Sequence, residues 1–133
     1  MGAGKTIIVG DKKPENAQAV AKILNEAGYD ALPMEMDLSD RKSILSLLEK
    51  AQERGPVTML VNAAGVSPSQ APIETILKVD LYGTAVLLEE VGKIIASGGV
   101  GVTISSQSGH RMAQLTPEQD ELLACTPPEE LLA

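Results

Sequence analysis

Hydrophobic positions along the chain change their spacing several times, and these changes predict alternating strands and helices. Short continuous apolar runs, typical of strands buried in a parallel sheet, occur four times. Between them, apolar residues recur every three or four positions, as on one face of a helix. The runs predicted as strands are residues 6–9, 31–36, 57–61 and 100–104.

The helices predicted between these strands have recognisable ends. Pro14 opens the first helix, and Gly28 follows its last turn. Ser39 is the predicted N-cap of the second helix, which stops near Gly55. A third, long helix is predicted over 73–96, where a pair of glycines follows.

Strand–helix alternation with connections of this length favours parallel pairing. We therefore predict an α/β fold, with a partial doubly wound parallel sheet of about four strands and helices on both faces. The chain has 133 residues and shows no repeat or linker, which favours one domain over 1–133.

The last part of the chain follows a different pattern. Thr116 begins a capping box with proline at the first helical position, which predicts a short helix to about residue 124. Thr126 repeats the signal only a few residues before Ala133, so we expect the chain to stop inside an element. Cys125 lies between the two signals, and we expect a buried or inert thiol there rather than a nucleophile.

Charge and composition exclude several classes of partner. Eleven basic residues against 18 acidic ones give a net charge of −7, which is unfavourable for binding nucleic acid. No apolar run is long enough to span a membrane, and the N-terminus does not have the pattern of a secretory signal. A single cysteine fits a reducing cytoplasm, and no cluster of His and Cys predicts a metal site. We expect a cytoplasmic protein without metal, nucleic-acid or membrane binding.

Two other features could carry chemistry, and each has an ordinary structural explanation. Residues 2–6 imitate the end of a phosphate-binding loop, but their lysine precedes a strand rather than a helix. The adjacent glutamate pairs at 89–90 and 129–130 face different ways on helices, so they are interpreted as solvated faces rather than acid–base pairs.

Ligands of parallel sheets bind beyond the carboxyl ends of the strands, so the residues there are candidates. Asp11 follows the first strand, where an acid accepts hydrogen bonds from a ribose diol and repels a 2′-phosphate. An acid near the start of the next helix is the equally weighted alternative. Asp37 follows the second strand and could contact adenine or cap the following helix.

The third and fourth strands end in small and hydroxyl residues. Asn62, Ala63, Ala64 and Gly65 follow the third strand, where small residues let a backbone approach a ligand, or simply form a tight turn. The fourth strand ends in two serines, Ser105 and Ser106, and a hydroxyl there could orient an alcohol or carbonyl. Serine-rich turns without such a role are also common.

Taken together, these strand ends resemble the short-chain dehydrogenase/reductase family. The Asn-Ala-Ala-Gly motif is the most diagnostic feature, and the resemblance covers nearly the whole chain. The resemblance also includes an acid after one strand and an Asp-hydrophobic pair after the next. A Val-Asn-x-x-Gly motif and a Ser-Ser turn follow farther along the chain. The matching positions are Asp11, Asp37, Leu38, Asn62, Ala63, Ala64, Gly65, Val79, Asp80, Gly83 and Ser106.

The resemblance implies a Rossmann-like fold and an NAD(P)(H)-dependent oxidoreductase that interconverts an alcohol and a ketone or aldehyde. It implies catalytic roles for Ser106 and Asp80, and cofactor contacts from Asp11, Asp37, Leu38 and the 62–65 motif. Asp11 favours NAD over NADP. The implied partner is a small-molecule alcohol or carbonyl substrate, and the full-length form is expected to be homo-oligomeric.

The chain also departs from the family pattern in three ways. The strand and glycine-rich turn that hold the cofactor pyrophosphate have no room before Asp11. The family proton donor is a tyrosine downstream of the serine, whereas Tyr29 and Tyr82 both precede Ser106. The family asparagine is Asp80 here, and an ionised carboxylate only accepts hydrogen bonds. We therefore expect the isolated chain to be inactive, with a non-catalytic nucleotide- or partner-binding module as the alternative.

Without its first family strand, the sheet would contain a gap at its centre. We predict that the strands at 6–9 and 57–61 close this gap by pairing directly, and that the chain is poorly stable in solution.

Overall fold

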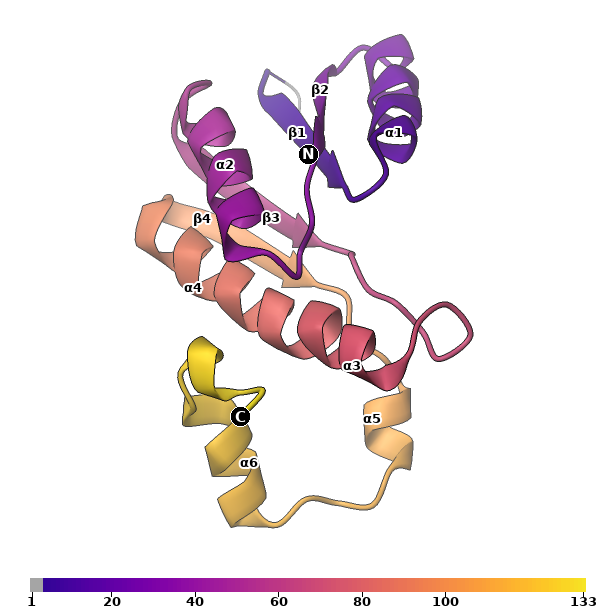
Figure 1. Cartoon of the computed structure of the whole chain (residues 1–133). Helices are drawn as coiled ribbons and strands as arrows, with labels where there is room; N and C mark the ends of the chain where they lie inside the picture. Colours follow the sequence, from indigo (N-terminus) through magenta and orange to yellow (C-terminus); the bar gives the residue numbers. More distant parts are fainter. Residues whose placement is uncertain (1–3) are drawn as a thin grey trace.

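The computed structural model describes residues 4–133 and confirms the alternation of strands and helices (Figure 1). The phosphate-loop imitation lies partly outside the described residues. The elements are β1 (Thr6–Asp11), α1 (Pro14–Glu26), β2 (Asp30–Glu35), α2 (Arg41–Gln52), β3 (Val57–Asn62), α3 (Ile73–Ile76), the π-helical η1 (Leu77–Gly83), α4 (Thr84–Ile94), β4 (Ile95–Thr103), α5 (Ser108–Arg111), α6 (Pro117–Cys125) and the 3₁₀-helical η2 (Pro128–Glu130).

The four strands form two separate parallel pairs rather than one sheet. β1 pairs with β2 and β3 pairs with β4, and no ladder joins β1 to β3 among the described residues. The prediction that these two strands pair directly is therefore wrong. Helix α2 contacts both β1 and α4. Helix α2 therefore links the first strand pair to the helix that precedes β4.

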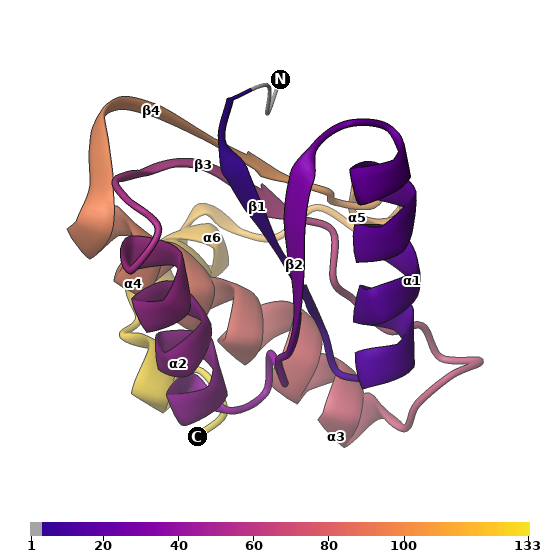
Figure 2. The same ribbon diagram turned by 90° about the horizontal axis from the view of Figure 1, so that it is seen from above.

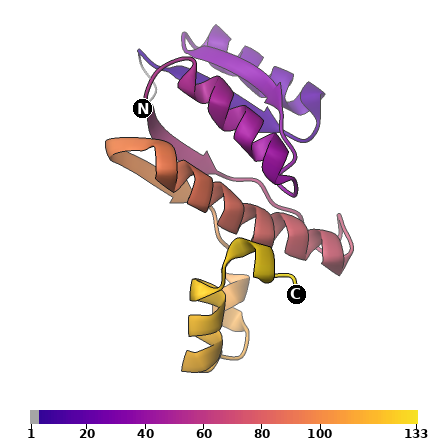
Figure 3. The same ribbon diagram turned by 60° about the vertical axis from the view of Figure 1, so that its left-hand side comes forward.

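Helices cover both faces of the β1–β2 pair, as predicted. Figure 2 shows α1 and α2 on opposite sides of these strands, and Figure 3 shows the same layers from the side. Small side chains at Ala17, Ala21 and Ala31 let α1 approach β2 closely. On the other side lies the main hydrophobic core, which comprises Met36, Leu38, Ile44, Leu48, Val79, Val86, Leu87 and Val91.

The long helix predicted over 73–96 is divided into α3, η1 and α4, and it ends earlier than expected. Ile95 already belongs to β4, where it pairs with Val57. The register then shifts before Met59 pairs with Val100, and Gly98 adopts a positive φ of 78° in this irregular stretch of β4. In the part of the chain that the structure describes, no helix is long and apolar enough to cross a membrane.

The N-cap of α2 is Asp40 rather than the predicted Ser39. The Asp40 carboxylate accepts a hydrogen bond from the Lys42 N–H at 3.0 Å. The Ser39 hydroxyl instead donates to Asp37 at 2.6 Å. Both residue types cap helices well, and the contact with Asp37 decides between them.

The glutamate pairs are not simple solvated faces, because Arg41 at the start of α2 gathers three of the four carboxylates. It forms ion pairs with Glu90, with Glu89 at 2.7 Å and with Glu129 at 2.5 Å. Glu90 is only 9% exposed, and the Arg41 hydrogen bond lowers the pKa of Glu89 below its ordinary value. The cluster joins α2, α4 and the C-terminal segment.

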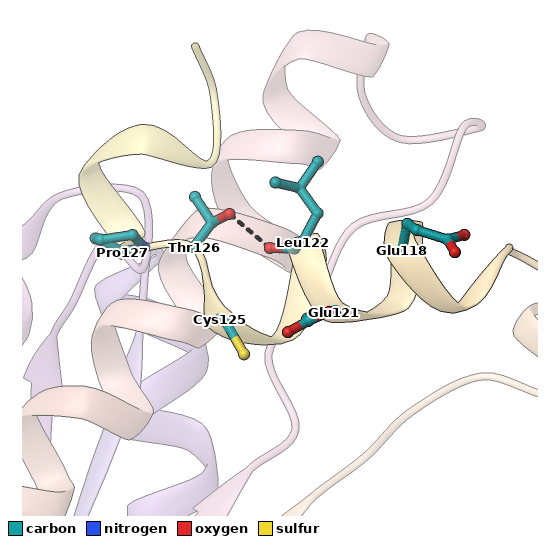
Figure 4. A pocket seen from close by; sticks show the side chains of 6 residues that line it. All are labelled: Glu118, Glu121, Leu122, Cys125, Thr126 and Pro127. Atoms are coloured by element: carbon teal, nitrogen blue, oxygen red, sulfur yellow. Dashed lines mark hydrogen bonds between the residues drawn. The ribbon is translucent and has the colours of Figure 1, made fainter.

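The C-terminal segment lies beside α4 and confirms the predicted capping box (Figure 1). The Gln119 side chain accepts from the Thr116 N–H at 2.9 Å, while the Thr116 hydroxyl accepts from the Gln119 N–H at 3.3 Å. Of the two alternatives for Cys125, a buried or an inert thiol, burial is wrong, because Cys125 is exposed at the end of α6. Figure 4 shows it on an open hollow of about 410 Å³, which is lined by residues of α6 and the following turn alone.

Candidate functional site

The carboxyl ends of β1 and β2 bring Asp11 and Asp37 to the same edge of the structure. The strands pair in register, with Asp11 opposite Glu35, and the Met36 N–H donates to the Asp11 carbonyl at 2.9 Å. The arrows of β1, β3 and β4 point toward the same side of the molecule (Figure 1). The candidate residues at the strand ends therefore share one edge.

Asp11 holds the loop that starts α1. Its Oδ1 accepts from the Lys13 N–H at 2.8 Å and from the Asn16 side chain at 3.4 Å. These bonds confirm the structural alternative considered for this acid. They use one carboxylate oxygen and leave Oδ2 without a hydrogen-bond partner in the described part of the chain, so the same residue can accept from a ligand hydroxyl.

The Asp37 carboxylate has the most hydrogen-bond and ion-pair partners of the acids at this edge. Its Oδ2 pairs with the Lys12 ammonium at 2.7 Å, and its Oδ1 accepts from the Ser39 N–H at 2.9 Å and from the Ser39 hydroxyl. Partial burial opposes its charge, but Lys12 and Ser39 outweigh this and hold the pKa of Asp37 below its ordinary value of 3.8. Asp37 is therefore ionised at neutral pH, and it is not the cap of α2.

Leu38 turns into the core beneath the junction of η1 and α4. A Cβ atom on Gly83 would lie 2.3 Å from the Leu38 carbonyl oxygen and 2.8 Å from Leu38 Cγ. Only glycine permits this approach. The pair Asp37-Leu38 therefore presents one polar side chain at the edge and anchors the loop with the next.

Asn62 ties three elements together at the end of β3. It is buried, with 4% exposure, and its carbonyl accepts from the Ile104 N–H at 2.8 Å. Its side chain accepts from the Ala64 N–H and donates to the Thr84 hydroxyl, both at 3.4 Å. The side chains of Ala63, Ala64 and Gly65 present little bulk, and all three residues are exposed, so their backbone is open to a ligand.

Asp80 connects this small-residue loop to the π-helical segment. Its Oδ1 accepts from the Val66 N–H at 3.0 Å, and a Cβ on Gly65 would lie only 3.3 Å from the same oxygen. Ser106 lies farther along, exposed, and its hydroxyl accepts from the Ser108 N–H at 3.1 Å. No hydrogen bond within residues 4–133 joins Ser106 to Asp80 or Asn62.

The structure thus brings the predicted residues together in two groups, and within residues 4–133 the Ser106 side chain is hydrogen-bonded to neither group. It also adds Lys12, which sequence reasoning did not single out, and Thr84, the partner of Asn62. A lysine directly after the candidate acid at the end of the first strand is the signal that could have identified Lys12. Within the described residues, no cluster of three or more metal-ligating side chains is present.

Comparison with known proteins matches this arrangement to one family. The sequence fits the family model of short chain dehydrogenases over residues 1–117. A short-chain dehydrogenase/reductase of Alternaria brassicicola is 35% identical over 133 residues, which cover 99% of this chain and 48% of that protein. The cis-4-hydroxycyclohexanecarboxylate dehydrogenase of Sinomonas cyclohexanicum is 28% identical, over 79% of this chain and 45% of that protein.

Solved structures share the fold. A short-chain dehydrogenase/reductase from Serratia marcescens superposes with a TM-score of 0.68 at 20% identity, covering 82% of this chain and 58% of that chain. A 7α-hydroxysteroid dehydrogenase in complex with NADH and 7-oxo glycochenodeoxycholic acid gives a TM-score of 0.70 at 21% identity, covering 81% and 46%. The chain spans about half the length of the curated relatives it matches. By sequence, it belongs to the short-chain dehydrogenase/reductase family.

Proposed function

We propose that this chain forms the adenosine-binding part of an NAD(H)-dependent oxidoreductase that interconverts an alcohol and a ketone or aldehyde. When bound, the nicotinamide cofactor supplies or accepts the hydride. Family membership supports the reaction class, and one structural neighbour was solved with NADH. The observation that carries the proposal is the edge formed by Asp11, Asp37 and the exposed backbone of 63–65.

The donor set of this edge fits the adenosine half of the cofactor. The Oδ2 of Asp11 is suited to a ribose diol, which donates two hydrogen bonds and carries no charge. The small residues after Asn62 leave room for a flat ring against the backbone. The start of α1 is a poor pyrophosphate site, because its N-cap is Lys13 and Pro14 lacks an N–H. The fit is thus to adenosine and not to the whole dinucleotide.

Ser106 is the proposed group for the substrate oxygen, as its exposed hydroxyl can donate to a carbonyl or accept from an alcohol. Asp80 is expected to act on the substrate site only indirectly, because its carboxylate holds the loop that contains Gly65 and Val66. Neither tyrosine is placed to supply a proton there, because Tyr29 precedes β2 and Tyr82 packs against the core. The isolated chain is therefore expected to bind and not to turn over.

The remaining parts of the proposal concern the whole protein. We expect a small-molecule alcohol or carbonyl substrate, a homo-oligomeric full-length form and a cytoplasmic location. The ion pair between Asp37 and Lys12 at the strand ends is compatible with a neutral hydroxyl ligand.

A titration of the purified chain with NADH, followed by cofactor fluorescence, tests the proposal. Asp11→Asn keeps the acceptor for the Lys13 N–H but removes the charge, and we expect roughly tenfold weaker binding, the usual effect of one charged hydrogen bond. Asp30→Asn, at the opposite end of the β1–β2 pair, is the matched control and should bind as the parent does.

The second candidate is a non-catalytic module that binds a nucleotide or a protein partner. The position of both tyrosines before Ser106 in the sequence favours it. Absence of any fluorescence change at millimolar NADH would replace the first proposal with this one.

A further inference from the structure

An ion pair lies across the carboxyl ends of β1 and β2, at the place proposed for the adenosine ribose. Lys12 Nζ and Asp37 Oδ2 are 2.7 Å apart. Lys12 immediately follows Asp11, while Asp37 is the second residue of the loop after β2. The pair therefore joins the two strand ends that would flank the ribose.

The two members of the pair are held to different degrees. The Asp37 side chain is 32% exposed and fixed by Ser39, whereas Lys12 is 67% exposed and has a flexible stem. Asp37 is thus the fixed partner, and it determines where the ammonium rests. Lys13 is the neighbouring cation, and its backbone N–H is bound to Asp11.

A phosphate group at the ribose 2′ position would change the electrostatics of this edge. It carries close to two negative charges at neutral pH, and a lysine ammonium is a common partner for phosphate. A free Lys12 would attract that group. Paired with Asp37, its charge is compensated, and the Asp11 carboxylate next to it has no ion pair among the described residues.

We propose that Asp37 is a positioning residue for cofactor specificity: by holding Lys12, it withdraws the cation that would otherwise bind a 2′-phosphate. This inference rests on the proposed function, and it assigns to Asp37 a role that acts through Lys12 rather than through direct contact with adenine. The pair therefore reinforces the preference for NAD(H) that Asp11 alone would give.

A charge cycle over the two residues tests this role, with the ratio of NADPH to NADH affinity as the readout. Asp37→Asn keeps the acceptor for Ser39 and frees the Lys12 charge, so the ratio should rise about fivefold, the effect of one unit charge some 4 Å away in water. Lys12→Gln leaves Asp37 uncompensated and should lower the ratio. The double variant restores neutrality and should return the ratio to the parent value.

Lys13→Ala is the matched control, since it removes a neighbouring cation outside the pair and should leave the response to Asp37→Asn intact. The gain should also shrink as salt is raised. A purely structural role for Asp37 would weaken both cofactors equally and leave the ratio unchanged.

The outcomes separate this inference from the proposed function. If the parent binds NADH and the ratio stays constant in both single variants, the role of Asp37 is refuted while NADH binding stands. If the double variant keeps the gain of Asp37→Asn, Asp37 repels the phosphate directly and Lys12 has no part. If the folded parent binds neither cofactor, the proposed function fails, and this inference fails with it.

Discussion

Gly83→Ala should destabilise the chain, because the helix that carries Gly83 rests against the backbone of the Asp37-Leu38 loop. An added Cβ would lie 2.3 Å from the Leu38 carbonyl oxygen, more than 1 Å inside normal contact. The main obstacle is backbone, so η1 and α4 must move as a unit. Such overpacking costs about 1–3 kcal/mol, against up to about 1 kcal/mol gained by replacing glycine in a helix.

Gly92→Ala is the matched control in the same helical run. Gly92 is exposed, and a Cβ there meets no atom within 4 Å. It should therefore raise the free energy of unfolding by about 0.5–1 kcal/mol. Urea unfolding followed by far-ultraviolet circular dichroism measures both variants. The reasoning is refuted if Gly83→Ala is as stable as the parent, or if Gly92→Ala loses as much stability as Gly83→Ala.

Three further predictions concern the polar groups around this loop. The folded-state pKa of Asp37 is depressed, so its stabilising contribution is present above pH 3.8 and is lost as the pH falls through the folded value; Asp37→Asn should flatten that part of a stability–pH curve. Asn62→Ala removes a buried amide that bonds to Ala64 and Thr84, and it should cost about 1 kcal/mol in urea unfolding; an unchanged midpoint would contradict its bridging role. Glu129→Gln should speed amide exchange in η2 by releasing it from Arg41, whereas Glu130→Gln, whose side chain has no ion pair in the described residues, should not.

The order of strands and helices can be predicted from the sequence, because apolar residues are spaced differently in strands and in helices. Buried strands give continuous apolar runs, and α1 and α2 give a repeat of three to four residues, so local patterns suffice. The candidate residues were also placed correctly at the strand ends, since parallel connections bring those ends to one edge. Proline and the capping box at Thr116 determine the start of α6 locally, and the structure agrees.

The features that the sequence did not reveal depend on contacts distant in the chain. Glu90 is buried where it pairs with Arg41, which lies 49 residues away in the sequence. No local sequence pattern predicts that contact. The sequence does not predict where α4 ends, because Ile94 and Ile95 are equally apolar. Only the pairing with Val57 makes Ile95 a strand residue. The separation of β1 from β3 is likewise a matter of pairings between segments distant in the chain, β1 with β2 and β3 with β4.

Binding of the adenosine part of a nicotinamide cofactor at the carboxyl ends of β1, β2 and β3 can be tested residue by residue. Amide chemical-shift mapping of the folded chain with NAD⁺ is the most direct measurement. We expect shifts concentrated at residues 11–13, 37–38 and 63–66. Shifts confined to the hollow around Cys125, or none at millimolar NAD⁺, would contradict it.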